Sequence, residues 1–392
     1  MTAHRRLMAS LGAFVVSAPL ITGCTDSSGP DAPAPAASAG AVDLKAAGCP
    51  ATIVVQTDWN PESEHGYTYQ MLGDDAVVDA GKKSVSGPLY LGGRSTGVKL
   101  EVRAGGPAIG YTGVGAQLYT DTSITMGYIT TDDQIAASAT TPTRAFFAPL
   151  DQSPAMVMWD PATYPEVNRV ADLKGALDKS GGVWRYLAGA AYQDYLLDAG
   201  LVSKKSQDAG YDGTPANFVA ARGKDVQQGY SSSEPYIYEH EVKAWGKPVK
   251  YALISETGWN PYPSAMAVRV ADFDKLSPCL KALTPVLQKS EVDYFANPAA
   301  ADDLIQKLVT EYNTGWTYSP GVADYARRTM IETKLVSNGT NSTLGDFDPD
   351  RMAKFLGTAQ PIYTRLGSPV AAGLKVGDLY TNEFIDTSIG LK

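Results

Sequence analysis

The chain has 392 residues, which is too many for the usual single domain, so we expect two lobes. Its 33 Lys and Arg residues against 42 Asp and Glu residues give a formal net charge of −9, which argues against a nucleic-acid partner and fits a soluble monomer. Hydrophobic residues make up 44% of the chain, enough to build a sizeable core.

The N-terminus has the pattern of an export signal. Arg5 and Arg6 precede an apolar run, Leu7 to Ile21, which is shorter than the roughly 20 residues that a membrane-spanning helix needs. The run closes on Gly23 and Cys24, which resembles the signal of bacterial lipoproteins, so we expect residues 1–23 to be removed and Cys24 to be acylated. The alternative is an ordinary signal peptide with an incidental cysteine.

The segment after the signal, residues 24–47, is rich in Ser, Pro and Ala and contains no core-forming run. This composition predicts a flexible tether. A lipid anchor and a tether would hold the globular body at the extracytoplasmic face of the cell membrane.

Two further cysteines, Cys49 and Cys279, lie in the body of the chain. Because cysteine pairs outside the cytoplasm tend to be bonded, we expect a disulfide between them, with two separate buried thiols as the alternative. The chain has no C-x-x-C pattern and its three histidines are far apart in sequence, so we expect no metal site.

From residue 50 onward, short β-like runs alternate with helical runs, which predicts parallel βαβ units. The runs fall at residues 50–56, 65–73, 98–105, 123–131, 132–140, 143–150 and 155–159, and in the middle of the chain at 190–201, 215–223, 226–231, 234–245 and 249–255. Ser233 is the expected N-cap of the helix at 234–245.

The C-terminal part changes in character, with helices predicted at residues 276–295, 299–313, 321–336 and 348–366. The whole pattern predicts lobe I at residues 48–155 and 264–392 and an inserted lobe II at residues 156–263, joined by hinge strands that cross near 155–158 and 263–269. A cleft between such lobes is a favoured ligand site.

One stretch stands out directly after the first strand, TDWNPESEHGY at residues 57–67. Its Trp, Glu and His side chains are costly to bury. Because ligands lie beyond the carboxyl ends of the strands in a parallel sheet, we expect this stretch to face a ligand.

This stretch resembles a known family. Asp58-Trp59-x-Pro61 followed by His65-Gly66 is similar to the W-x-P-N-x-x-H-x-G-x-Y signature of thiamine-precursor members among the periplasmic solute-binding proteins of ABC importers, although Glu62 replaces the asparagine. That family also serves nitrate and sulfonates. Supporting likenesses are DLKG at residues 172–175, Gly189 before a helix, QGYSSSEP at residues 228–235 and YTNEF at residues 380–384.

The resemblance implies a two-lobe α/β fold of the type II periplasmic-binding-protein class, with crossing hinge strands and a helical C-terminal portion. It also implies capture of a small-molecule solute without catalysis or cofactor, and an ABC permease as partner.

The candidate solute-binding residues lie at strand ends and helix starts. They are Asp58, Trp59, Glu64, His65, Tyr128, Thr130, Gly189, Tyr192, Tyr211, Gln228, Ser232, Glu234 and Tyr262.

Each candidate has a proposed role and a structural alternative. Trp59 would stack on a flat solute, or instead cap the core of lobe I. Glu64 would accept an N–H donor, and His65 would donate or accept, or instead lie on a helix surface. Thr130 would point into the cleft or only cap a helix, Glu234 would favour the helix dipole with or without a ligand, and Tyr262 would shut the cleft.

Charge separates the ligand classes. Residues 47–80, 225–242 and 254–268 contain no Lys or Arg, whereas nitrate, sulfonate or phosphate is normally matched by these side chains. We therefore expect a neutral or cationic, planar, nitrogen-bearing solute such as an aminopyrimidine.

Other functions stay open from the sequence. The solute could be nitrate, a sulfonate such as taurine, or a riboflavin-like compound, and the chain could be a secreted enzyme of pyrimidine metabolism or a cell-surface adhesion module. No G-x-S-x-G, H-E-x-x-H or Cys/His pair supports an enzyme.

Overall fold

The structure, a computed structural model, describes residues 42–392. The expected signal peptide (residues 1–23), the acylated Cys24 and most of the tether lie outside the described residues. Within residues 42–392, no helix combines the length and the apolar character needed to cross a membrane.

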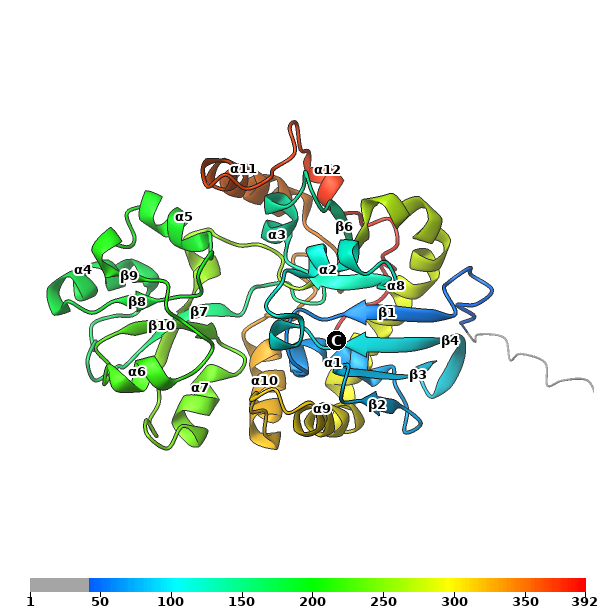
Figure 1. Ribbon diagram of the computed structural model, residues 1–392, viewed down its shortest axis with the longest axis horizontal. Coiled ribbons are helices and arrows are strands. Elements are labelled where there is room, and N and C mark those ends of the chain that lie inside the picture. The colour runs from blue at the N-terminus through cyan, green and yellow to red at the C-terminus, as the bar shows by residue number, and fades with distance from the viewer. Residues whose placement is uncertain (1–41) are drawn as a thin grey trace, which may run out of the picture. The chain divides into compact units, whose positions relative to one another are not determined.

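The described strands form two sheets (Figure 1). The seven-stranded sheet has the order β2-β3-β4-β1-β5-β12-β6, and the five-stranded sheet has the order β11-β7-β10-β8-β9. We call the first sheet with its helices lobe I and the second with its helices lobe II. The strands are β1 (Thr52–Gln56), β2 (Val77–Asp79), β3 (Ser84–Leu91), β4 (Arg94–Arg103), β5 (Met126–Ile129), β6 (Thr143–Phe147), β7 (Ala155–Trp159), β8 (Trp184–Arg185), β9 (Gln207–Asp208), β10 (Val226–Tyr230), β11 (Lys250–Leu253) and β12 (Ala265–Arg269).

Strand β1 sits at the centre of lobe I because both of its faces are apolar. Ile53 and Val55 pack into a core cluster with α8, whereas Val54 packs on the opposite face with Val114 and Leu118 of α2. A strand buried on both faces needs an unbroken apolar run, which TIVV provides.

Pairing within the sheets is mixed. β1 is parallel to β4 and β5, so their carboxyl ends meet at one edge. β3 is antiparallel to β4, β12 is antiparallel to β5 and β6, and β7 is antiparallel to β10 and β11. The expected parallel pairing therefore holds for β1, β4 and β5, whereas hairpins and return crossings reverse the chain direction at the other strands.

Helices cover both faces of the lobe II sheet (Figure 1). Val157 and Trp159 face the core that includes α4 and α5, whereas Met156 and Met158 face Phe218 of α6. The alternation along β7 therefore fixes which helices cover which side.

The predicted C-terminal run of helices is confirmed. The π-helical turn Ile237–Glu241 follows α7. Ser233 occupies the N-cap of α7, but its side chain makes no capping hydrogen bond to the helix backbone. The helices are α1 (Gly66–Gln70), α2 (Val114–Thr120), α3 (Thr131–Ala136), α4 (Val170–Ser180), α5 (Tyr192–Asp198), α6 (Ala216–Ala220), α7 (Glu234–Tyr236), α8 (Phe273–Ala296), α9 (Ala299–Tyr312), α10 (Pro320–Glu332), α11 (Pro349–Arg365) and α12 (Val376–Leu379), and the short 3-10 turns include η1 (Ser63–His65) and η2 (Gly106–Ile109).

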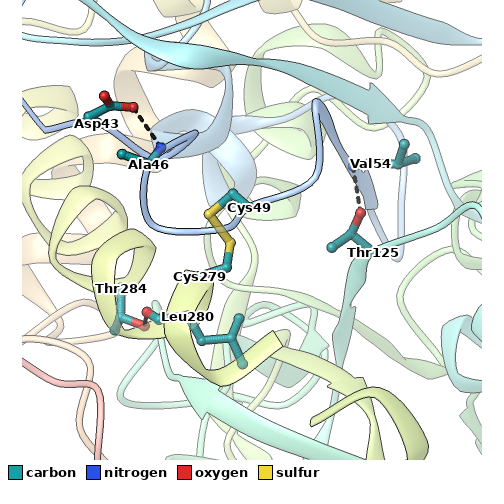
Figure 2. Close-up of a disulfide and its surroundings, with 8 residues drawn as sticks. All are labelled: Asp43, Ala46, Cys49, Val54, Thr125, Cys279, Leu280 and Thr284. Carbon is teal, nitrogen blue, oxygen red and sulfur yellow. Dashed lines mark hydrogen bonds between the residues drawn. A yellow bond between two sulfur atoms is a disulfide. The ribbon is translucent and has the colours of Figure 1, made fainter. Parts of the chain in front are cut away.

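A disulfide joins Cys49, just before β1, to Cys279 of α8 (Figure 2). The two residues are 230 positions apart in sequence and their Cα atoms lie 4.6 Å apart. The bond therefore ties the beginning of the described chain to the helical C-terminal part.

The chain passes between the two sheets in two segments, one between β6 and β7 and one between β11 and β12. Arg351 of α11 binds both. Its guanidinium donates to the backbone carbonyl and carboxylate of Asp151 in the first segment, and to Asn260 and the carbonyl of Pro261 in the second.

Tyr262 is part of this junction. The sequence had suggested that its ring would close the cleft, but the ring is buried between the crossing segment and α11. Tyr262 is 2% exposed, its ring lies 3.7 Å below the Arg351 guanidinium, and its hydroxyl accepts a hydrogen bond from the Asp348 backbone. An aromatic ring beside a return crossing is drawn into the core when a neighbouring helix supplies both a cation and a donor.

Candidate functional site

The candidate site begins where β1 ends. The Thr57 hydroxyl donates to the Trp59 carbonyl over 2.7 Å and accepts from the Gly105 backbone over 3.0 Å. These bonds turn the chain sharply away from the sheet, so that Asp58, Trp59 and the residues up to His65 lie at the strand's carboxyl end.

Asp58 and His65 hold each other in this turn. His65 Nε2 lies 2.7 Å from Asp58 Oδ1, and the Ser264 hydroxyl donates to the other carboxylate oxygen over 2.5 Å. Burial acts to raise the pKa of Asp58, but the hydrogen bond and charge of His65 outweigh it and leave that pKa below its ordinary value. His65 is fully buried with its ring against Tyr128, so we expect it to orient Asp58 rather than to contact a solute directly.

Residues of the two lobes meet at Glu64. The Ser232 hydroxyl, which follows β10 in lobe II, donates to the Glu64 carboxylate of lobe I. Glu234, close behind Ser232, accepts hydrogen bonds from the Tyr230 backbone at 2.8 Å, from the Ser233 hydroxyl at 2.7 Å and from the Tyr211 hydroxyl at 3.4 Å.

Glu62 stands out among these acids, because no hydrogen bond to its carboxylate occurs in the described part of the chain. Burial raises the pKa of Glu62 well above its ordinary value, and the charges of Glu64, Asp58 and Glu234 raise it further. Burial likewise raises the pKa values of Glu64 and Glu234. Carboxylates from both lobes therefore crowd together, and the groups that act most strongly on Glu62 are acids. We call Asp58, Glu62, Glu64 and Glu234 the acidic cluster.

Aromatic rings adjoin the acidic cluster. Trp59 lies 5.9 Å from Tyr111 and 6.1 Å from Trp316 between ring centroids, and Trp316 stacks on Tyr318. Burial raises the pKa of Tyr318 well above its ordinary value, and the charge of Glu64 raises it further. The Tyr318 hydroxyl is hydrogen-bonded to Ser63, which lies between Glu62 and Glu64. From lobe II, Tyr230 is 43% exposed, and the charges of Glu234, Asp58 and Glu62 add to the effect of burial in raising its pKa.

The structure brings part of the predicted set together and separates the rest. Hydrogen bonds join Asp58 to His65, Glu64 to Ser232 and Glu234 to Tyr211, and Trp59 follows Asp58 in the chain.

The other predicted residues have different surroundings. Tyr128 is fully buried and bonded to Thr68 inside lobe I. Tyr192 is buried, and its hydroxyl donates to Gln228 over 2.6 Å within lobe II. Both tyrosines lie in the cores, because strand-end and first-turn positions point inward as readily as outward.

Two predicted positions make no side-chain contact with the acidic cluster. Thr130 occupies the N-cap of α3 without a capping bond to the helix backbone. Gly189 has a left-handed φ of 86°, and a Cβ added there would meet open space. Tyr262 lies in the crossing junction described above.

The candidate set from the sequence did not include Tyr111, Trp316 or Glu62. A signal existed for the two aromatics, because each is a large ring in a turn-rich loop, GGPAIGYTG and NTGWTYSP. For Glu62 the signal was partial, because Glu64 and Asp58 belong to the same turn, whereas the added charge of Glu234 depends on lobe II.

Elsewhere in the described chain, two surface cavities of about 290 and 320 Å³ share Leu91, Gly92 and Asp293 and include none of the predicted residues. Within residues 42–392, no group of three or more His, Cys, Asp or Glu side chains is arranged to hold a metal ion.

Neither a family model nor a curated protein matches this chain. Solved structures do. The alkanesulfonate-binding protein SsuA of Xanthomonas axonopodis pv. citri bound to MOPS superposes with a TM-score of 0.52 at 13% identity, covering 85% of this chain and 98% of that one. The periplasmic aliphatic sulphonate binding protein SsuA of Escherichia coli gives 0.50 at 15% identity, covering 82% and 89%.

A third solved structure is a putative sulfonate ABC transporter component, the periplasmic sulfonate-binding protein SsuA of Methylobacillus flagellatus KT. It gives a TM-score of 0.50 at 14% identity and covers 85% of this chain and 92% of that one. All three are described as binding proteins rather than enzymes. At these identities the likeness concerns the fold, and the chain has the two-lobe α/β fold of type II periplasmic binding proteins, with a helical C-terminal part.

Proposed function

We propose that this chain is the solute-binding component of an ABC importer, and that it captures a small, planar, nitrogen-bearing organic cation between its two lobes. An aminopyrimidine related to thiamine precursors is the class that fits best. The protein captures and releases the solute unchanged and delivers it to a permease.

The observation that carries this proposal is the acidic cluster. Asp58, Glu62 and Glu64 come from lobe I and Glu234 comes from lobe II, and Glu62 has no hydrogen-bond partner in the described chain. Crowded carboxylates in a partly desolvated site cost free energy unless a cation or protons neutralise them. A solute with N–H donors and a positive charge supplies both neutralisation and partners.

Sulfonate is the second candidate, because the similar structures are described as sulfonate-binding proteins. An anionic sulfonate needs Arg, Lys or several free backbone N–H groups. The charges that act most strongly on Glu62 are instead negative, so the fold agrees with a sulfonate binder while the site charge does not.

The anchoring belongs to the same proposal. Acylation at Cys24 after loss of residues 1–23 would keep the binding lobes close to a permease at the extracytoplasmic face. The tether expected at residues 24–47 would end before Leu44, which is buried in the core of lobe I and donates its backbone N–H to Thr96. Lobe limits at residues 48–155 with 264–392 and at 156–263 are part of this proposal. Mass spectrometry of the protein purified from its native membrane would show the acylated cysteine as the first residue.

The test uses two probes of similar shape and opposite charge. Purified protein is titrated by calorimetry with an aminomethyl-aminopyrimidine, a planar cation, and with benzenesulfonate, a planar anion. We expect micromolar binding of the cation, equivalent to about −8 kcal/mol, and none of the anion. Chromatography of the released cation should return it unchanged. Binding of benzenesulfonate alone would refute the charge argument, and chemical conversion of the cation would indicate an enzyme.

A further inference from the structure

Three aromatic rings from three separate segments meet at the site. Trp59 follows β1, Tyr111 follows the turn η2, and Trp316 lies on the loop between α9 and α10. The Trp59 and Tyr111 rings are inclined at 51°, and the Trp59 and Trp316 rings are perpendicular at 90°. Trp59 therefore contacts two aromatic rings, Tyr111 and Trp316, each from a different segment and each tilted against the Trp59 ring.

Tyr111 is held in an unfavourable conformation. Its φ is 59°, in the left-handed region that bulky residues rarely adopt, and its side chain is 63% exposed. Its backbone N–H donates to the Gly106 carbonyl over 2.9 Å, which fixes this conformation. A strained backbone and an exposed ring are both costs to the empty protein, and residues of this kind gather at ligand clamps.

The Tyr111 segment is firmly attached to the Trp59 turn. Gly105 donates to the Trp59 carbonyl over 2.8 Å, and Gly106 donates to the Asp58 carbonyl over 3.0 Å. A Cβ added to Gly106 would lie 2.7 Å from Trp59 Cε3, so glycine is needed for this close approach. The position of Tyr111 is thus set relative to Trp59 and Asp58.

The Trp316 loop is attached in the same way. The Thr314 hydroxyl donates to Asn60 over 2.7 Å, and the Tyr318 hydroxyl accepts from the Ser63 backbone over 2.9 Å. The indole Nε1 of Trp316 is buried without a hydrogen-bond partner. A buried donor without an acceptor is costly, and an acceptor on a solute would remove the cost.

We infer that Tyr111 and Trp316 contact the solute and, with Trp59, form an aromatic wall that holds its flat heteroaromatic ring. A ring nitrogen or carbonyl of the solute accepts from Trp316 Nε1. This inference rests on the proposed function, in which the acidic cluster binds the cationic part, and it adds that the solute carries an aromatic ring with an acceptor atom.

The first test separates ring contact from backbone strain. Tyr111→Gly removes the ring and relieves the left-handed strain, whereas Lys334→Gly, at an exposed position with the same φ of 59°, relieves strain only. We expect Tm to be unchanged or about 2 °C higher in both variants. Binding of the aminomethyl-aminopyrimidine should weaken about tenfold in Tyr111→Gly, because one stacked ring is lost, and should not change in Lys334→Gly.

The second test removes only the indole donor. Trp316→Phe keeps a ring, so we expect about fivefold weaker binding of the aminopyrimidine and no change for benzylammonium, a ring cation without an acceptor. Suppose that the wild-type protein binds the aminopyrimidine and benzylammonium. If Tyr111→Gly and Trp316→Phe then bind both compounds as tightly as the wild-type protein, the inference is overturned and the proposed function stands. If the wild-type protein binds neither probe, the proposed function falls and this inference falls with it.

Discussion

At the scale of single residues, the half-buried carboxylate of Glu62 shows how a site can oppose stability. Local sequence presents it as one acid in a polar turn. In the folded protein it faces Glu64 and Asp58 of its own lobe and Glu234 of the other, and its pKa is raised. A residue that weakens the empty protein and has no hydrogen-bond partner in the described chain is best explained by what it binds.

We expect Glu62→Gln to raise Tm at neutral pH and to weaken binding of a cationic aminopyrimidine by at least tenfold. The amide of Gln has the shape of the carboxylate but carries no charge. The protein without solute is therefore more stable, because repulsion by the neighbouring acids is gone, and the complex is weaker, because the cation loses an anionic partner. Thermal unfolding and calorimetry measure the two effects. Glu332→Gln, at an exposed position on α10, is the matched control and should change neither. Lower stability with unaltered affinity in Glu62→Gln would contradict a ligand-binding role.

The pH dependence of stability follows from the same residue. Because the folded-state pKa of Glu62 is raised above 4.5, the folded protein binds more protons than the unfolded chain between that pH and the raised pKa. The free energy of unfolding attributable to Glu62 therefore falls as pH rises through this window. We expect the Tm advantage of Glu62→Gln over wild type to disappear toward pH 4.5 and to grow as the pH rises above it. An advantage that is constant with pH would show that repulsion at Glu62 is not its source.

At the scale of elements, helix α11 links the two segments that cross between the lobes. Arg351 donates to Asp151 in one segment and to Asn260 and Pro261 in the other, and covers the Tyr262 ring. Helix α11 is thus bound to both crossing segments. Under the proposed function, in which the lobes close on a solute by rotation about these segments, Arg351 would restrain that rotation.

We expect Arg351→Met to lower the free energy of unfolding by about 3–5 kcal/mol, because several buried carbonyls and the Asp151 carboxylate lose their partner. Denaturant unfolding measures the loss. Arg365 lies on the same helix as Arg351 and makes an exposed ion pair with Asp198 of α5. Arg365→Met removes this pair and should lower the free energy of unfolding by less than about 1 kcal/mol. Equal effects of the two substitutions would show that the crossing segments do not depend on Arg351.

In the described molecule as a whole, the disulfide between Cys49 and Cys279 links two segments that are far apart in the sequence. Cys49 and Cys279 are 230 residues apart, and chain-entropy arguments give about 5 kcal/mol for a loop of this length. We expect reduction of the protein, or Cys49→Ser combined with Cys279→Ser, to lower the free energy of unfolding by up to this amount. Solute affinity should change little, because the bond lies between the segment before β1 and α8 rather than at the acidic cluster. Unfolding in denaturant with and without reductant measures the difference, and an unchanged midpoint would contradict it.

Features that depend on a local pattern could be predicted from the amino-acid sequence. The apolar run at residues 50–56 predicted strand β1, the helical periodicity of the C-terminal part predicted α8 to α11, and Asp58 to His65 were expected directly after the first strand, where they lie. These features follow from the spacing of apolar side chains along a few turns or residues, which the sequence shows directly.

Which of these residues come into contact depends on how distant segments pack in the folded chain. Tyr128 and Tyr262 were expected to line the cleft but lie in the core. The Tyr128 hydroxyl is hydrogen-bonded to Thr68, and the Arg351 guanidinium covers the Tyr262 ring, and both partners are far away in the sequence. Tyr111 and Trp316 both lie beside Trp59 although their loops are more than two hundred residues apart, and Glu234 of the opposite lobe adds its charge to those of Glu64 and Asp58 around Glu62. Crowding of charge and convergence of rings are properties of long-range packing, which no local pattern encodes.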